Sequence, residues 1–202
     1  MKYSTVLFFA CGLLLLCACG NRQQPASASG EPPKTDTTTD QFFPIADYLQ
    51  SEIRYVDSTP LAILKSETFN DRKDSTFLTP AEFHRLASTF LLPGLDADSL
   101  KKNYTENSFS DKTTGYLTFT YSPKDKDLPL QRVDVVVSPG RGVDKVKSIY
   151  LERVARESDT LTVTKMYWEA RHSFQVITSL QPAGKTPLFR QLKVVWDAGE
   201  TD

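Results

Sequence analysis

Cysteine and histidine are the residue types that most often hold a metal ion or act as a nucleophile or base, and this chain has few of them. Its three cysteines lie within the first nineteen residues, and its two histidines, His84 and His172, stand far apart. Metal and nucleophilic sites need several such groups at characteristic spacings. The sequence has no HExxH, CxxC, phosphate-loop or dinucleotide-binding pattern. We therefore expect no metal, no cofactor and no catalytic residues, and we interpret the chain as a protein that is not an enzyme.

The last cysteine belongs to a different kind of pattern. Lys2 precedes an apolar run from Val6 to Ala18, which is shorter than the roughly 20 residues that a membrane-spanning helix needs. A short apolar run behind a basic residue is typical of the central part of a secretory signal peptide. The run ends in Leu16-Cys17-Ala18-Cys19. These residues resemble the lipobox of bacterial lipoproteins.

The resemblance implies that signal peptidase II cleaves before Cys19, with Leu16, Cys17 and Ala18 as its recognition residues, and that Cys19 receives acyl chains such as palmitate. Stable membrane anchoring takes two lipid signals, and two or three chains on Cys19 would supply them. Gly20 stands where some lipoproteins carry the Asp that retains them at the inner membrane. The resemblance therefore implies an envelope lipoprotein, anchored most plausibly in the outer membrane and facing the periplasm.

Composition divides the chain into three parts. Residues 1–18 form the expected lipoprotein signal peptide. Residues 19–41 combine the lipidated cysteine with a polar, proline-containing segment without aromatic or large aliphatic residues, which predicts a disordered tether. Treated as a flexible coil, 22 residues span roughly 25 Å. Aromatic residues begin at Phe42, so we expect a single folded domain over residues 42–202.

Hydrophobic periodicity within this domain changes from helical to strand-like. Apolar residues recur at three- and four-residue spacing over 45–56 and 83–91, and the second stretch follows Thr79-Pro80-Ala81-Glu82, a typical capping box. Two runs over 61–69 and 75–78 predict a short hairpin around a turn at 70–74. Beyond residue 103 apolar residues alternate and the connections are short, as in an antiparallel meander. The fold class we predict is α+β: six or seven strands covered by two amphipathic helices, with the short additional hairpin.

The net charge and the aromatic residues indicate which classes of partner the protein can bind. Lys plus Arg total 24 against 25 Asp plus Glu, which argues against nucleic-acid binding. Tyr167 and Trp168 are neighbours on one predicted strand, and Trp196 lies on another. If helices cover only one sheet face, either Tyr167 or Trp168 is exposed, so Tyr167, Trp168 and Trp196 are candidates for contact with a partner or ligand.

Asp-Ser and Asp-Thr pairs recur and resemble an O-glycosylation motif of exported bacterial proteins, although such pairs are also ordinary turn and cap residues. We expect those of the domain to lie at turns: Asp57-Ser58, Asp74-Ser75, Asp98-Ser99 and Asp159-Thr160.

Three functions stay open at this point. The first is an envelope lipoprotein with a non-catalytic domain that binds a protein partner. The second is a carrier of a lipid or other small apolar ligand, in which helices cover a half-barrel. The third, an envelope hydrolase, would need paired carboxylates that the spacing does not show.

Cys19→Ser should leave an unprocessed precursor that takes up no labelled fatty acid, because serine cannot form the thioether to the lipid. A chain that starts at Gln41 should unfold cooperatively, and its melting temperature should not change with added reductant, since residues 42–202 contain no cysteine. Metabolic labelling and mass spectrometry measure the first outcome, and thermal melting measures the second. Normal processing of Cys19→Ser, with an unlabelled wild type, would identify a plain secreted protein instead.

Overall fold

The computed structural model describes residues 42–70, 72–138 and 145–196, all within one compact unit. The lipobox residues Leu16, Cys17, Ala18 and Cys19 and the expected tether lie outside the described residues. In the described part of the chain, no helix is both long and apolar enough to span a membrane.

Three short α-helices form at the places where the sequence offers apolar spacing and caps. Helix α1 (Ile45–Ser58) buries its three- and four-residue repeat against the sheet. Helix α2 (Pro80–Ala87) starts with the expected capping box, in which the Thr79 backbone N–H donates to Glu82 Oε2 at 2.8 Å and the Glu82 N–H donates to Thr79 Oγ1 at 3.3 Å. A 3₁₀ turn, η1 (Ser88–Phe90), extends it, and α3 (Ala97–Asn103) is capped by Asp96.

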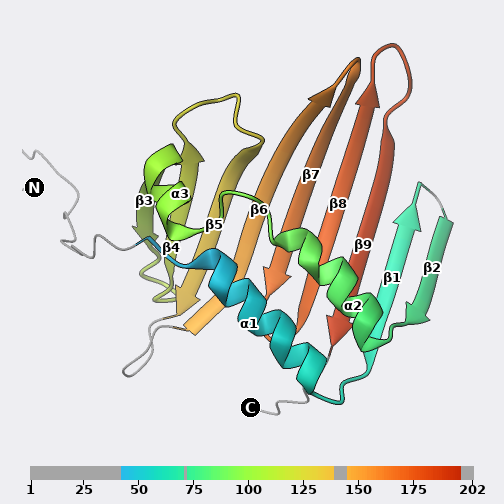
Figure 1. Ribbon diagram of the computed structural model, residues 1–202, viewed down its shortest axis with the longest axis horizontal. Coiled ribbons are helices and arrows are strands. Elements are labelled where there is room, and N and C mark those ends of the chain that lie inside the picture. The colour runs from blue at the N-terminus through green and yellow to red at the C-terminus, as the bar shows by residue number, and fades with distance from the viewer. Residues whose placement is uncertain (1–41, 71, 139–144, 197–202) are drawn as a thin grey trace, which may run out of the picture. The chain divides into compact units, whose positions relative to one another are not determined.

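The strands form one antiparallel sheet of nine, in the order β2-β1-β9-β8-β7-β6-β5-β4-β3 (Figure 1). Their bounds are β1 Ile63–Phe69, β2 Arg72–Phe77, β3 Tyr104–Ser110, β4 Leu117–Pro123, β5 Leu130–Ser138, β6 Lys145–Glu157, β7 Thr160–Glu169, β8 Ser173–Pro182 and β9 Leu188–Trp196. The α+β class is as predicted.

The strand count exceeds the predicted six or seven for two physical reasons. Strand β3 carries polar residues on both faces, so the period-two signal that marks a half-buried strand is weak there. The predicted hairpin is also part of the main sheet, because β1 pairs with β9 from Ile63↔Trp196 to Phe69↔Arg190. This pairing joins segments more than a hundred residues apart, which local patterns do not reveal.

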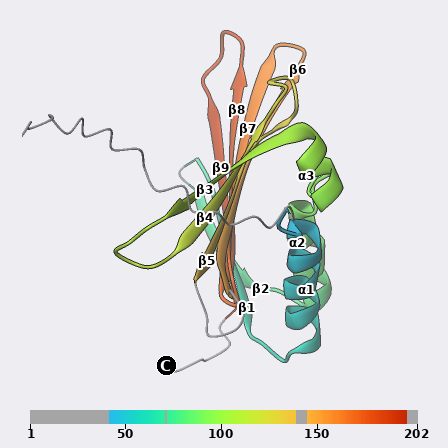
Figure 2. The same ribbon diagram turned by 90° about the vertical axis from the view of Figure 1, so that its left-hand side faces the viewer.

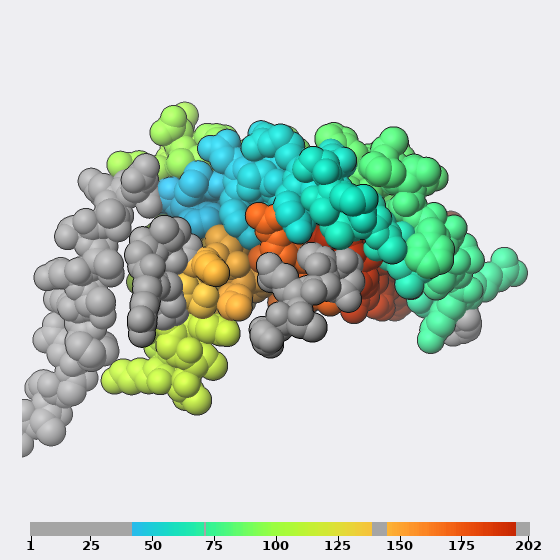
Figure 3. Space-filling model, turned by 90° about the horizontal axis from the view of Figure 1, so that it is seen from below, coloured from blue at the N-terminus to red at the C-terminus, as the bar shows by residue number. Residues whose placement is uncertain are grey.

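Among the residues that the structure describes, the helices all lie on one side of the sheet, here named the covered face, and none lies on the other side, the open face (Figure 2). Seen along the sheet in Figure 3, α1 and α2 form a single layer over the orange and red strands. Strands β6–β9 are 9 to 13 residues long and extend past α2, so the helical layer covers only part of their length (Figure 1).

An aromatic cluster joins the two layers. It consists of two residues from α2 and η1 and three from the sheet, all fully buried: Phe83, Phe90, Trp168, Phe174 and Trp196. Phe83 meets Trp196 edge to face at 5.1 Å between ring centroids, and Phe90 meets Trp168 at 5.2 Å. Both indole N–H groups are buried without a hydrogen-bond acceptor among the described residues.

Adjacent residues Tyr167 and Trp168 provide a matched test of this core. Trp168→Ala removes a fully buried ring and should lower the free energy of unfolding by about 3–5 kcal/mol. Tyr167→Ala removes a side chain from the open face and should cost about 1 kcal/mol or less. Urea denaturation measures both values. Equal costs for the two variants would contradict the assignment of covered and open faces.

Candidate binding surfaces

The three aromatic candidates separate by sheet face. Trp168 and Trp196 are 0% exposed and belong to the core, so they offer no surface for a partner. Tyr167 is 41% exposed and lies near the middle of the open face, where β7 pairs with β6 and β8. Of the candidates within the described residues, Tyr167 alone therefore lies on the surface.

The two histidines take structural positions. His84 on α2 approaches Asp57 on α1, with 2.6 Å between Nδ1 and Oδ2, so this pair links the two helices. His172 lies in the turn before β8, and its carbonyl accepts the Trp196 backbone N–H at 2.9 Å. No group of three or more His, Cys, Asp or Glu suited to a metal ion occurs among the residues that the structure describes.

One of the four Asp-Ser and Asp-Thr pairs lies at a turn, as expected, and the other three lie within helices or a strand. Asp57-Ser58 ends α1, Asp98-Ser99 lies in the first turn of α3, and Asp159-Thr160 leads from a turn into β7. Asp74-Ser75, predicted at a turn, lies inside β2 and pairs with β1, because the turn closes earlier, around Asn70, whose φ is 49°. Asparagine tolerates this left-handed conformation better than most residues.

A polar network occupies the open face beside Tyr167. Asp134 on β5 accepts from Thr120 Oγ1 at 2.8 Å and from Arg132 Nε at 2.9 Å. Tyr150 on β6 donates from its hydroxyl to Glu152 Oε2 at 2.7 Å. Burial, and then this hydrogen bond to a carboxylate, raise the pKa of the Tyr150 phenol well above its usual range. These groups satisfy one another across β4, β5 and β6.

An apolar groove follows on the same face, farther along β7–β9. It holds about 290 Å³ and is lined by residues at alternate positions of these strands: Val163, Lys165, Ile177, Ser179, Gln181 and Phe189. Phe189 is 56% exposed and Ile177 is 37% exposed. Exposed apolar side chains grouped in this way are typical of contact surfaces. With Tyr167 they form what we name the open-face surface: Tyr167, Val163, Ile177 and Phe189.

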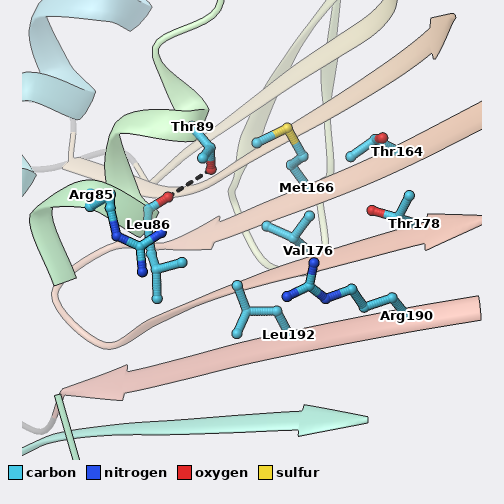
Figure 4. A pocket seen from close by; sticks show the side chains of 9 residues that line it. All are labelled: Arg85, Leu86, Thr89, Thr164, Met166, Val176, Thr178, Arg190 and Leu192. Atoms are coloured by element: carbon cyan, nitrogen blue, oxygen red, sulfur yellow. Dashed lines mark hydrogen bonds between the residues drawn. The ribbon is translucent and has the colours of Figure 1, made fainter. Parts of the chain in front are cut away.

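A second groove lies on the covered face, where the helical layer ends (Figure 4). It holds about 260 Å³, with α2 and η1 on one side and β7–β9 as its floor. Its lining residues come from four separate segments: Arg85, Leu86, Thr89, Thr164, Met166, Val176, Thr178, Arg190 and Leu192. Sequence reasoning missed this groove. Alternation does place pairs such as Val176 and Thr178 on one face, but it cannot show where α2 ends above them.

A buried ion pair fixes α1 against the turn between β7 and β8. Glu52 is 2% exposed, and its Oε1 lies 3.0 Å from Arg171 Nε, while its Oε2 accepts the Arg171 backbone N–H at 2.9 Å. The Arg171 guanidinium also lies 3.7 Å from the centre of the Tyr55 ring. Arg171 holds a φ of 61°, a conformation that costs energy for a residue with a side chain.

Loss of this ion pair should weaken the fold. Arg171→Ala removes the guanidinium from a buried carboxylate, which keeps the residue 171 backbone N–H and the Tyr48 hydroxyl as donors. The change should lower the free energy of unfolding by about 2–3 kcal/mol, less than for a fully buried pair because the Arg171 side chain is half exposed. Adding Glu52→Gln should restore part of the loss, since no unpaired charge is then buried. The control is Arg54→Ala, which removes an exposed arginine from α1, the helix that carries Glu52. Equal losses for the Arg171 and Arg54 variants in urea denaturation would refute the role of the pair.

Comparison with known proteins identifies no relative of this chain. No family model, no curated protein and no solved structure matches it. What the protein binds is therefore inferred from its own residues.

Proposed function

We propose that this protein is a membrane-anchored envelope lipoprotein whose domain binds a protein partner through the open-face surface, without catalysing a reaction. The observation that carries this proposal is Tyr167, which is 41% exposed near the centre of a sheet face that none of the described helices covers, with an apolar groove beside it. Tyrosine supplies a large contact area and a polar group together, and it is enriched in protein interfaces.

The anchor half of the proposal rests on the lipobox resemblance. Acyl chains on Cys19 attach the chain to the outer membrane on the periplasmic side, and the segment up to Gln41 lets the domain reach a partner at some distance. A partner in the same envelope fits this arrangement, because tethering to one surface raises the local concentration of the two proteins. The balanced charge of the chain gives no reason to include nucleic acid among its partners.

Hydrogen bonds hold several carboxyl groups of the described residues in structural roles. Four described carboxyl groups have a lowered pKa. A side-chain hydrogen bond from Arg190 is the main cause at Glu67, and backbone N–H donors are the main cause at Glu82, Asp96 and Asp111. These groups are held as carboxylates and suit capping and ion pairing.

A carrier function is the second candidate, and the covered-face groove is the observation that favours it. With about 260 Å³ the groove is slightly smaller than typical small-molecule sites, which range over about 300–1,000 Å³. The sheet order runs from β2 at one edge to β3 at the other, which describes an open sheet. The groove is also open to solvent, so it would suit a small ligand held at the surface.

Photocrosslinking in the native envelope tests the open-face surface. A benzophenone amino acid in place of Tyr167, or of Ile177 on the next strand, should yield the same discrete adduct from the full chain. The same probe in place of Lys101, exposed on α3 in the helical layer, should not. Gel shift and mass spectrometry identify the adduct.

Tyr167→Ala then separates specific contact from proximity. In the chain that carries the probe at Ile177, this change should reduce the adduct at least fivefold, which corresponds to about 1 kcal/mol of contact energy. An adduct that forms equally from Lys101, or that ignores Tyr167→Ala, would overturn the assignment of this face.

A further inference from the structure

We infer that the covered-face groove at the end of α2 is a binding site for a small amphipathic carboxylate, with an apolar body against the sheet and its anionic group between Arg85 and Arg190. This inference rests on the carrier candidate above and specifies the chemistry of its ligand. The site lies on the opposite side of the sheet from the open-face surface and is independent of the partner binding proposed there. A membrane-anchored domain with both sites could hold a protein and a small ligand at once.

The groove exists because the two layers differ in extent. Strands β7–β9 continue past the helical layer, so α2 and η1 end above the sheet and form a step (Figure 1). Leu86 and Thr89 form the wall of that step, and the side chains of β7–β9 form its floor (Figure 4). Thr89 Oγ1 donates to the Leu86 carbonyl at 2.6 Å, which satisfies one acceptor at the end of α2.

The floor is apolar and remains partly open to solvent. Met166, Val176 and Leu192 occupy neighbouring strands in register, since Met166 pairs with Val176 and Val176 pairs with Leu192. Met166 is 3% exposed, whereas Val176, Leu192 and Leu86 are half-buried. Half-buried apolar side chains in a concave site gain free energy when a ligand covers them, at about 25 cal/mol per Å² removed from water.

The next row of the sheet is polar and cationic. Thr164, Thr178 and Arg190 follow one another across β7, β8 and β9, and Arg153 on β6 pairs with Thr164 at the end of this row. In Figure 4 the Arg190 guanidinium lies between Val176 and Leu192, and Arg85 lies beside Leu86 across the groove. Hydroxyl and guanidinium groups around an apolar floor match a ligand with one anionic end.

The charges near the groove favour an anion. Two acidic groups lie near its arginines. Glu82 on α2 lies near Arg85 and is held by Thr79 in the capping box. Arg190 Nε donates to Glu67 Oε1 at 2.6 Å, and Lys65 Nζ lies 3.6 Å from Glu67 Oε2, so two cations neutralise this carboxylate. Arg85 and Arg153 add positive charge on either side of this pair. A carboxylate at the groove would therefore meet a local excess of cations.

Met166 provides a specific reporter, because Met1 is the only other methionine. The full chain, labelled with ¹³C-methyl methionine and embedded in phosphatidylcholine nanodiscs, is titrated with octanoate and followed by NMR. Met166→Leu assigns the resonance. Octanoate should shift the Met166 methyl signal saturably, whereas octan-1-ol and octylammonium, with the same chain length, should need at least tenfold higher concentrations.

Variants separate the charge from the shape of the groove. Arg190→Gln and Arg85→Gln should each weaken octanoate binding about fivefold, as expected for a partly exposed charged contact, and Arg190→Lys should retain most of it. Arg156→Gln, an exposed arginine facing the opposite side of β6, should leave binding unchanged. Thermal melting of each variant shows that it is folded.

Two results would overturn this inference and leave the open-face proposal intact. One is an equal shift of the Met166 methyl signal with octanoate, octan-1-ol and octylammonium, which would indicate non-specific partitioning of the alkyl chain into apolar surface. The other is an effect of Arg156→Gln as large as that of Arg190→Gln. If the probe at Tyr167 gave no discrete adduct but octanoate bound normally, the open-face proposal would be wrong and the groove inference would stand.

Discussion

Burial of the aromatic cluster is the interaction on which the rest of this structure depends. Phe83 and Phe90 come from the helical layer, and Trp168, Phe174 and Trp196 come from three neighbouring strands, so one cluster holds helix to sheet and strand to strand. Truncation of a buried ring to alanine typically costs about 3–5 kcal/mol, a large part of the stability of a small domain. Because Trp196 lies on the last described strand, the cluster is complete only when β9 has joined the sheet.

The position of this cluster also decides where the molecule has free surface. The helices cover the aromatic cluster and the aliphatic core around it. They do not cover the full length of the longer strands, which project past the helical layer (Figure 1). On the covered face this produces a step with a groove lined by Arg85 and Arg190. On the open face, the residues alternating with the core present Tyr167, Ile177 and Phe189 to solvent. Both candidate surfaces therefore follow from how much of the sheet the helical layer covers.

Short-range sequence patterns predicted the helices and strands well where a pattern is typical of only one kind of secondary structure. The repeat from Ile45 to Val56 predicted α1, and Thr79 with Glu82 predicted the start of α2, because helix faces and caps are set by residues three or four apart. Alternation at Val133, Val135 and Val137 predicted β5 in the same way. The pattern failed at β3, where both faces are polar, and at β2, which begins at Arg72 inside the predicted turn.

The candidate surfaces show where tertiary structure takes over. Alternation by itself determined that Tyr167 and Trp168 lie on opposite faces, because the side-chain period of a strand is two. Which of them is buried depended on where the helices pack, and that followed from the whole apolar surface of the sheet. The covered-face groove depends on even more of the tertiary structure. Arg85 and Arg190 line the same groove because β1 pairs with β9 and α2 packs on the sheet. The sequence alone thus determined most of the elements and the alternation of faces within them, because these depend on residues close together in the chain. Long-range pairing and packing decided which residues share a surface.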